Sequence, residues 1–180
     1  MAEKLSQNFN LEEFTVSSTA KAKGISNIPT AQHKSNLKYL CVSVLEPLRT
    51  LLNAKYTTYQ GKKVKSVSMK ITSGYRSPAL NKAVGGSITS QHCTGEAVDI
   101  KAVITWQDGT KKELPYNELY EDIKVFVKLG KLNTDQVIQE RSGLAKWVHL
   151  SFKVQNISKN RKQFLKYNGS TYQLDVCFIH

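Results

Sequence analysis

Apolar residues recur at the spacing of one helix face over residues 35–53. The apolar positions are Leu37, Leu40, Cys41, Val44, Leu48 and Leu51. This spacing matches the 3.6-residue period of an amphipathic helix. Pro47 lies inside the pattern and lacks a backbone N–H, so we expect a kink or a boundary there. A second amphipathic helix is predicted over residues 118–129, with Asn117 as its cap and Gly130 as its stop.

Alternation of apolar and polar residues predicts several strands. Residues 67–71 alternate in this way, and so do residues 97–103. Residues 135–140 and 146–152 are also strand-like and are joined by a short loop that contains a glycine, which predicts an antiparallel hairpin. A further hairpin is predicted around Asn168-Gly169, because this dipeptide is typical of tight turns.

Two other segments have local signals. Residues 9–32 are interpreted as an irregular arm, which Leu11 and Phe14 pin to the body of the protein. Ser77 has the character of a helix cap, and Pro78 suits the first position of a short helix.

The mixture of strands and helices predicts an α+β fold with a small, mostly antiparallel sheet flanked by helices. The length of 180 residues and the absence of repeats or linkers favour one domain. We divide residues 1–180 into an N-terminal arm (1–32), a core (33–153) and a C-terminal extension (154–180).

The charge of the chain favours anionic partners. There are 26 Lys and Arg against 14 Asp and Glu, a formal net charge of +12. Nucleic acid and a bacterial envelope both fit this excess, but no zinc-finger or RNA-binding signature accompanies it, so no specific nucleic acid is expected. No apolar run reaches the length of about 20 residues that a membrane span needs. The first residues, Met1-Ala2-Glu3-Lys4, lead into no apolar signal core, which favours synthesis in the cytoplasm.

Two histidines and an aspartate are candidate metal ligands. His92 and Asp99 are seven residues apart across a glycine, and His149 lies on a predicted strand. Two imidazoles and a carboxylate suffice for a catalytic zinc that keeps its fourth position for water. On spacing alone this signal is weak, because such a pair is more often a hydrogen bond. His33 and His180 are predicted to be exposed and inert.

The three cysteines do not indicate a disulfide framework, because their number is odd and they are far apart. Cys41 is interpreted as a core residue, and Cys177 is left open. Cys93 is adjacent to His92, and adjacent residues on an extended chain point to opposite faces, so Cys93 is expected to face away from a metal.

The sequence around these residues resembles that of a known family. The segments concerned are Ser73-Gly74-Tyr75-Arg76-Ser77-Pro78-Ala79-Leu80-Asn81, Val84-Gly85-Gly86-Ser87, Ser90-Gln91-His92, Gly95-Glu96-Ala97-Val98-Asp99 and Trp147-Val148-His149-Leu150-Ser151. In combination, over roughly residues 9–153, they resemble the M15 family of zinc peptidases. The branch with the greatest similarity holds the small D-alanyl-D-alanine carboxypeptidase-like and phage-encoded members.

This resemblance implies a fold like that of hedgehog proteins and DD-peptidases, one zinc ion per chain, and a role for each matching residue. His92, Asp99 and His149 match the metal ligands. Arg76 matches an arginine that stabilises the tetrahedral intermediate, with a structural ion pair as the alternative. Ser90 matches a position that contacts substrate, with loop capping as the alternative.

The chain departs from the family at the general base. Many relatives have an acidic residue three positions before the final histidine, where this chain has Lys146, a poor proton acceptor at neutral pH. Glu140 is the best replacement, provided that the hairpin pairs it with Trp147 and so places it on the face of His149. Pairing with Lys146 would place it on the opposite face. Glu96 is the reserve candidate.

The expected function is hydrolysis of an amide bond in peptidoglycan stem peptides by a monomeric, phage-type lysin that acts at the bacterial cell wall. Both D-Ala-D-Ala carboxypeptidase and L-Ala-D-Glu endopeptidase activities fit. The alternatives are a catalytically degenerate module that binds zinc and a wall peptide, a phage structural component, and a nucleic-acid binder supported by charge alone.

Overall fold

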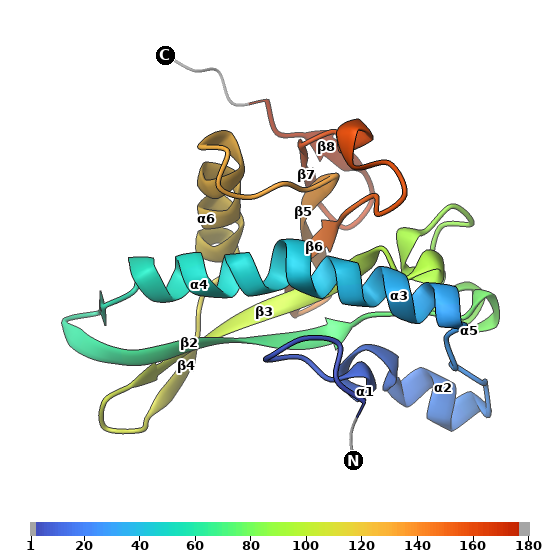
Figure 1. The fold of residues 1–180 in the computed structure, drawn as a ribbon, viewed down its shortest axis with the longest axis horizontal. Helices are drawn as coiled ribbons and strands as arrows, with labels where there is room; N and C mark the ends of the chain where they lie inside the picture. The colour runs from blue at the N-terminus through green and yellow to red at the C-terminus, as the bar shows by residue number, and fades with distance from the viewer. Residues whose placement is uncertain (1–2, 177–180) are drawn as a thin grey trace.

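An eight-stranded sheet forms the centre of the protein in the computed structural model, which describes residues 3–176 (Figure 1). The strands are β1 (Thr58–Tyr59), β2 (Lys62–Ser73), β3 (Ala97–Trp106), β4 (Lys111–Glu113), β5 (Gln136–Ser142), β6 (Ala145–Ser151), β7 (Gln163–Tyr167) and β8 (Tyr172–Leu174). The α-helices are α1 (Leu11–Thr15), α2 (Ser18–Lys23), α3 (Ala31–Leu40), α4 (Glu46–Lys55), α5 (Pro78–Ala83) and α6 (Tyr116–Lys128). A π-helix (Cys41–Leu45) joins α3 to α4, and short 3₁₀ turns cover Gln91–Thr94 and Ile157–Lys159.

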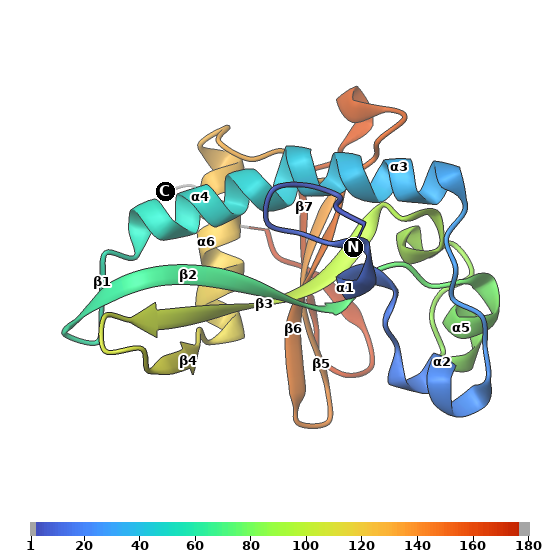
Figure 2. The same ribbon diagram turned by 60° about the horizontal axis from the view of Figure 1, so that its bottom comes forward.

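The strand order is β1-β2-β3-β6-β5-β7-β8, and β4 pairs with β3. Among these pairs β5 and β7 run parallel, and the others are antiparallel. Figure 2 shows that the sheet is strongly twisted, since β5 and β6 cross the direction of β2 and β3. The prediction of an α+β domain with a mostly antiparallel sheet flanked by helices is confirmed.

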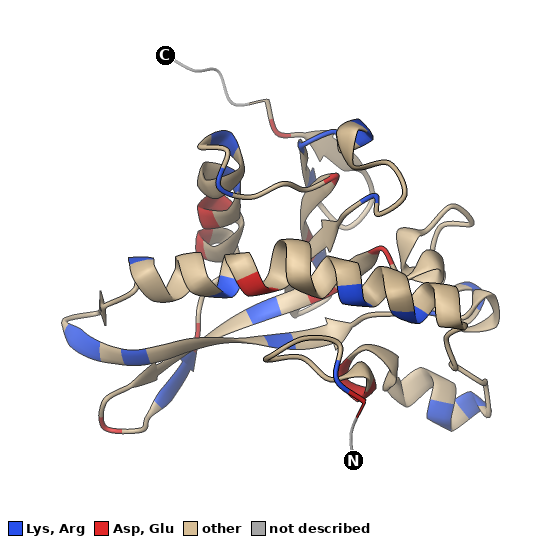
Figure 3. Cartoon of the chain, in the orientation of Figure 1, with Lys and Arg blue, Asp and Glu red and all other residues tan. Residues whose placement is uncertain are grey.

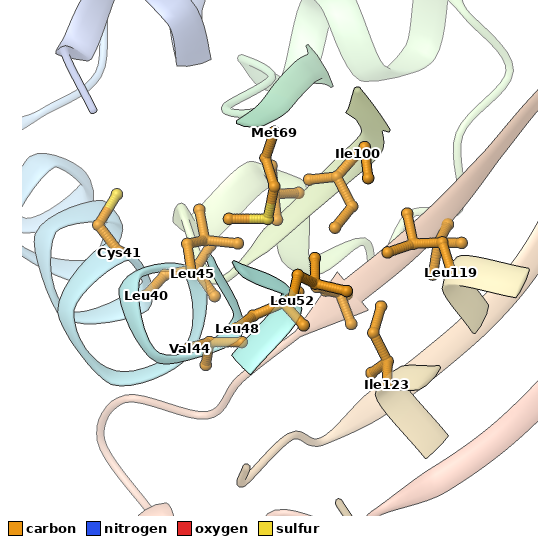
Figure 4. Packing of buried hydrophobic residues seen from close by; sticks show 14 of the residues in the cluster. Leu40, Cys41, Val44, Leu45, Leu48, Leu52, Met69, Ile100, Leu119 and Ile123 are labelled. Carbon is orange, nitrogen blue, oxygen red and sulfur yellow. The ribbon is translucent and has the colours of Figure 1, made fainter. Parts of the chain in front are cut away.

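The hydrophobic core lies between one face of the sheet and the helices α4 and α6. Ile100, Leu48 and Ile123 are fully buried there and come from β3, α4 and α6 (Figure 4). Cys41 belongs to the same cluster, which confirms its interpretation as a core residue. Because successive side chains of a strand alternate in direction, Asp99 projects from the opposite face of β3. α4 and α6 therefore lie on the face of the sheet opposite Asp99.

The long helix of the sequence pattern is interrupted just before Pro47, as the missing N–H predicts. Glu46 donates its backbone N–H to Cys41, five residues back, which is the bond of a π-helix. Pro47 then occupies the start of α4, where an N–H is not needed. Figures 1 and 2 show that α3 and α4 still form one long rod across the sheet.

The expectation of an irregular arm over residues 9–32 is wrong, because two short helices form there. Glu13 accepts the backbone N–H of Asn10 at 2.8 Å, and the Ser17 side chain caps α2. These side chains satisfy N–H groups that a helix start otherwise leaves open. Phe14 is fully buried and Leu11 is 9% exposed, so the predicted anchoring of the arm is confirmed.

The helix α6 begins earlier than predicted. Its N-cap is Pro115, and Asn117 lies inside the first turn instead of capping it. Proline presets the backbone angle that a helix start requires, so it supplies the boundary without a capping hydrogen bond. Gly130 has a φ of 69°, which confirms it as the stop. Within residues 3–176, no helix combines the length and the apolar character needed to cross a membrane.

Both predicted hairpins are present. β5 and β6 are antiparallel with Ser142 opposite Ala145, so the turn between them has two residues. β7 and β8 are antiparallel and enclose the Asn168-Gly169 turn. The short helix α5 also starts where predicted, and the Ser77 side chain accepts the Leu80 N–H.

Candidate metal centre

Three side chains from two strands and one turn converge on the face of the sheet opposite α4 and α6. His92 lies in the 3₁₀ turn before β3, Asp99 lies on β3, and His149 lies on β6. Asp99 and His149 are direct partners in the β3–β6 ladder, which brings together residues 50 positions apart in the sequence. One donor atom from each of the three residues lies within 4.8 Å of the others.

The distances within this cluster suit a tetrahedral metal. His92 Nε2 is 3.2 Å from His149 Nδ1 and 3.3 Å from Asp99 Oδ1. His149 Nδ1 is 2.9 Å from Asp99 Oδ1. Ligands about 2.0–2.1 Å from a tetrahedral zinc lie about 3.3 Å apart, so the three atoms approximate one triangular face of such a site. Two imidazoles and one carboxylate are also a donor set that zinc accepts.

The orientation of His92 is fixed by the backbone of Gly74. His92 Nδ1 lies 2.6 Å from the Gly74 carbonyl oxygen, so it carries the proton and leaves Nε2 free to act as a ligand. A Cβ on Gly74 would lie 2.6 Å from the backbone of Phe14, so only glycine permits α1 to pack this closely. The arm thus supports the carbonyl group that orients the histidine.

The protonation states also suit a metal. Burial would raise the pKa of Asp99, but the two neighbouring histidines lower it well below the ordinary value. Burial lowers the pKa of His92 despite the neighbouring Asp99 carboxylate. An ionised aspartate and a neutral histidine are the forms that bind metal ions.

Arg76 contacts the same aspartate from its other oxygen. Arg76 Nη2 donates to Asp99 Oδ2 at 2.7 Å, and Arg76 Nε donates to Ser73 Oγ at 2.9 Å. Asp99 Oδ1 faces the two histidines, so one carboxylate oxygen points to the candidate metal position and the other binds Arg76. Arg76 therefore forms the structural ion pair that the sequence analysis gave as an alternative. Its partner in that pair, Asp99, is itself a candidate metal ligand.

Glu140 lies on the same face as the cluster, because the hairpin adopts the favourable register. Glu140 pairs with Trp147, and Ile138 pairs with His149. Burial raises the pKa of the Glu140 carboxyl group, the charge of Asp99 adds to this effect, and His149 opposes it. Lys146 pairs with Arg141 and points to the helix side of the sheet.

Glu96, the reserve candidate for the general base, accepts hydrogen bonds from groups outside the cleft. Its Oε1 accepts the Val154 backbone N–H at 2.8 Å, and its Oε2 accepts the Thr94 hydroxyl at 2.9 Å. These bonds tie the start of β3 to the segment that follows β6. Glu96 is therefore a structural residue and is absent from the cleft that holds the cluster.

A cleft of about 460 Å³ opens onto the cluster. Its lining includes Arg76, Ser90, His92, Glu140 and His149. Ser90 occupies the cap position of the 3₁₀ turn, but its side chain makes no capping hydrogen bond there. Its hydroxyl is therefore not committed to the capping role that the sequence left open.

The remaining histidines and cysteines lie outside the cluster. His33 is half-buried and stacks on Tyr75 with ring centroids 5.1 Å apart, so the expectation that it is exposed is wrong. An aromatic neighbour removes one face of its ring from water. Cys93 is half-buried and is not one of the three grouped donors. His180 and Cys177 lie outside the described residues.

The family model described as Peptidase M15 matches residues 7–114. The chain belongs to the peptidase M15 family. The matched segment contains Arg76, Ser90, His92 and Asp99, and it ends before Glu140 and β6. Comparison with curated proteins gives no significant match.

Membership of the M15 peptidases makes the chain a hydrolase of the metallopeptidase type with a peptide substrate. M15 peptidases are generally zinc dependent, and the His-Asp-His cluster is a group that can hold a metal ion. The cluster geometry adds His149, which lies outside the matched segment, to the two candidate ligands within it, His92 and Asp99.

Two residues near the M15 site were missed from the sequence. Asn27 donates to the carbonyl groups of Thr15 and Tyr75 and accepts the Ser77 N–H, so it fastens the arm to the Arg76 loop. Tyr172 donates its hydroxyl to Glu140. A polar residue flanked by Gly and Pro gives no distinctive signal in a sequence. For Tyr172, alternation along the predicted C-terminal hairpin was the available signal.

Proposed function

We propose that the protein is a zinc metallopeptidase that hydrolyses an amide bond in peptidoglycan stem peptides. The observation that carries this proposal is the convergence of His92, Asp99 and His149 beside Glu140 in one cleft. The family match supplies the peptidase chemistry, and the cluster supplies three ligands with one side open to the cleft.

Each residue of the cleft has a separate role in the proposed reaction. When bound, zinc supplies a Lewis acid that makes a water more acidic and polarises the scissile carbonyl group. Glu140 accepts the proton of the attacking water and passes it to the leaving amine. Arg76 keeps Asp99 in place and stabilises the negative charge that develops on the carbonyl oxygen. Ser90 hydrogen-bonds the peptide backbone at the rim.

The surroundings of the site suit an extended peptide. A second, larger groove of about 1070 Å³ shares Arg76, Gly85, Gly86, Glu140 and Tyr172 with the cleft. The reacting bond would therefore lie where the two hollows meet, with substrate residues on both sides. This arrangement favours an endopeptidase of the L-Ala-D-Glu type over an enzyme that removes a terminal D-Ala.

The charge of the protein supports an anionic setting for the substrate. Figure 3 shows Lys and Arg along β2, in α2 and α3 and near the end of α6, rather than gathered in one groove. A spread of positive charge attracts an anionic cell envelope without a defined nucleic-acid footprint. We infer a phage-type lysin that acts as a monomer at the bacterial wall and recognises no specific nucleic acid.

Digestion of defined muropeptides, analysed by mass spectrometry, tests this function. A product split between L-Ala and D-Glu would support the endopeptidase, and release of one D-Ala would support the carboxypeptidase. Activity should disappear with a chelator and return with added zinc. His149→Ala serves as the matched inactive control. Intact muropeptides after incubation with the zinc-loaded protein would contradict a peptidase of this substrate class.

A catalytically degenerate binding module is the second candidate, and the lysine at the usual base position favours it. Lys146 Nζ lies over the ring of Tyr116, 5.3 Å from the centroid, and cannot serve the cleft. The degenerate module predicts stoichiometric zinc and retention on purified cell walls without clearing in a zymogram. The same result would fit a phage structural component.

A further inference from the structure

The β7–β8 hairpin forms one wall of the candidate site. β7 runs parallel to β5 with Ile138 opposite Leu165, and β8 pairs with β7 so that Tyr172 lies opposite Tyr167. Paired residues share a face, so Tyr172 projects toward the face that carries Glu140. Leu165 and Tyr172 both line the cleft. This wall lies beyond the segment that the family model matches.

Tyr172 contacts the proposed base directly. Its hydroxyl donates a hydrogen bond to Glu140 Oε1 at 3.2 Å. The bond occupies one carboxylate oxygen, and the Trp147 side chain also acts on this carboxylate. Burial and the Glu140 carboxylate raise the pKa of Tyr172 to about 12, so the hydroxyl stays protonated and remains a donor at neutral pH. The ring packs on Tyr167 with centroids 4.6 Å apart, which restricts its rotation.

The hairpin that carries Tyr172 is anchored at both ends. Before β7, Arg161 donates to both oxygens of the fully buried Asp135 carboxylate, at 2.8 and 2.6 Å. After β8, Asp175 accepts hydrogen bonds from Tyr120 and Lys124 of α6, at 2.9 and 2.6 Å. Charged hydrogen bonds of this kind are among the stronger ones in proteins. They hold the strand that bears Tyr172 at a fixed distance from β5.

We propose that Tyr172 is a positioning residue that holds the Glu140 carboxylate in its reactive orientation, so that the β7–β8 hairpin is part of the catalytic unit. This inference rests on the proposed function, because it assumes that Glu140 is the general base. A side chain held by one oxygen keeps a single rotamer, and correct placement of a base contributes directly to the rate.

The test is a double-mutant cycle on muropeptide hydrolysis, with kcat and KM measured separately for zinc-loaded protein. Tyr172→Phe keeps the ring and removes the hydroxyl. It should lower kcat roughly tenfold and leave KM and the zinc content unchanged, since one hydrogen bond to a charged group is lost. In the Glu140→Gln background the same change should have no further effect, because the group that Tyr172 positions is already absent.

Tyr167→Phe is the matched control. Tyr167 pairs with Tyr172, and in the part of the chain that the structure describes its hydroxyl makes no hydrogen bond to Glu140. It should retain the kcat of the wild type. Three outcomes would overturn the inference: an unchanged kcat in Tyr172→Phe, a rise in KM alone, or an equal tenfold loss in the Glu140→Gln background. Near-normal activity of Glu140→Gln itself would instead refute the base assignment, and the inference with it.

Discussion

Glu140 lies opposite Trp147 in the β5–β6 hairpin, so its carboxyl group projects from the face on which His149 and Asp99 lie. If Glu140 is the base, Glu140→Gln should retain zinc, because the amide keeps the shape and Glu140 is not a ligand. Its kcat should fall by about 10²–10⁴, the usual contribution of a positioned base. Steady-state kinetics with metal analysis of the same sample provides the measurement.

Lys146→Glu tests whether position 146 can replace the base. The family resemblance leads one to expect an acidic residue there, but Lys146 points toward Tyr116 of α6, on the other face of the sheet. The double variant with Glu140→Gln should therefore remain as inactive as Glu140→Gln alone. Lys146→Glu by itself should keep activity within about twofold, as expected of an exposed surface position. Rescue by the glutamate would show that β6 is remodelled in the active enzyme.

His149→Ala should abolish stoichiometric zinc. The substitution removes one of three ligands and leaves two, which is too few for a stable catalytic site. We expect the zinc content to fall from about one ion per chain to near zero, while circular dichroism shows a largely intact fold. His33→Gln is the control, because His33 lies outside the cluster. Full zinc retention in His149→Ala would remove this histidine from the site.

Arg76→Ala should lower kcat by about 10²–10³, the scale of losing one donor to a developing oxyanion. Because Arg76 also donates to Asp99, the zinc content of this variant must be measured alongside its kinetics. Arg76→Lys keeps the charge but not the paired geometry, and should recover only part of the rate. A loss confined to KM would make Arg76 a substrate anchor, and a loss of zinc would make it a support for the ligand.

Asp135 should make stability depend on pH. Burial would raise its pKa, but hydrogen bonds from Arg161 lower the pKa below the ordinary value. Its stabilising contribution is therefore present above the unfolded pKa of about 3.9, and is lost as the pH falls through the lower folded value. Asp135→Asn should cost about 1–3 kcal/mol at pH 7, and the difference from the wild type should shrink as the pH falls below the unfolded pKa.

Thermal unfolding of both proteins across this range supplies the measurement. Glu12→Gln, at an exposed position of α1, is the control and should change stability little across this range. A difference between Asp135→Asn and the wild type that does not shrink at all as the pH falls would show that the carboxylate charge is not the cause.

The elements were predictable from the sequence wherever one face of a helix or strand is buried in the core. Ile100 and its neighbours on β3 alternate clearly because one side packs on α4 and α6. The hairpin register was open, since a glycine fits either position of a short turn. The structure places Gly143 first, with a φ of 56°, and Leu144 second. A two-residue turn then fixes Glu140 opposite Trp147.

Residue types and the family resemblance predicted which residues form the site, but not the contacts that bring them together. The grouping of Asp99 with His149 depends on a strand pairing across 50 residues, for which local patterns give no information. The role of Gly74 depends on the close approach of Phe14, and that of Tyr172 on the parallel docking of β7. Each is a product of tertiary packing, so no residue of the arm or the extension was assigned to the site from the sequence.

The parallel docking of β7 onto β5 has a consequence for the order in which the protein is made. The ribosome completes the three metal donors once His149 has been translated, but Tyr172 follows more than twenty residues later. A nascent chain that has emerged only as far as β6 can gather its donors while one wall of the cleft is still missing. If the hairpin belongs to the catalytic unit, full peptidase activity would thus require that β7 and β8 have also emerged.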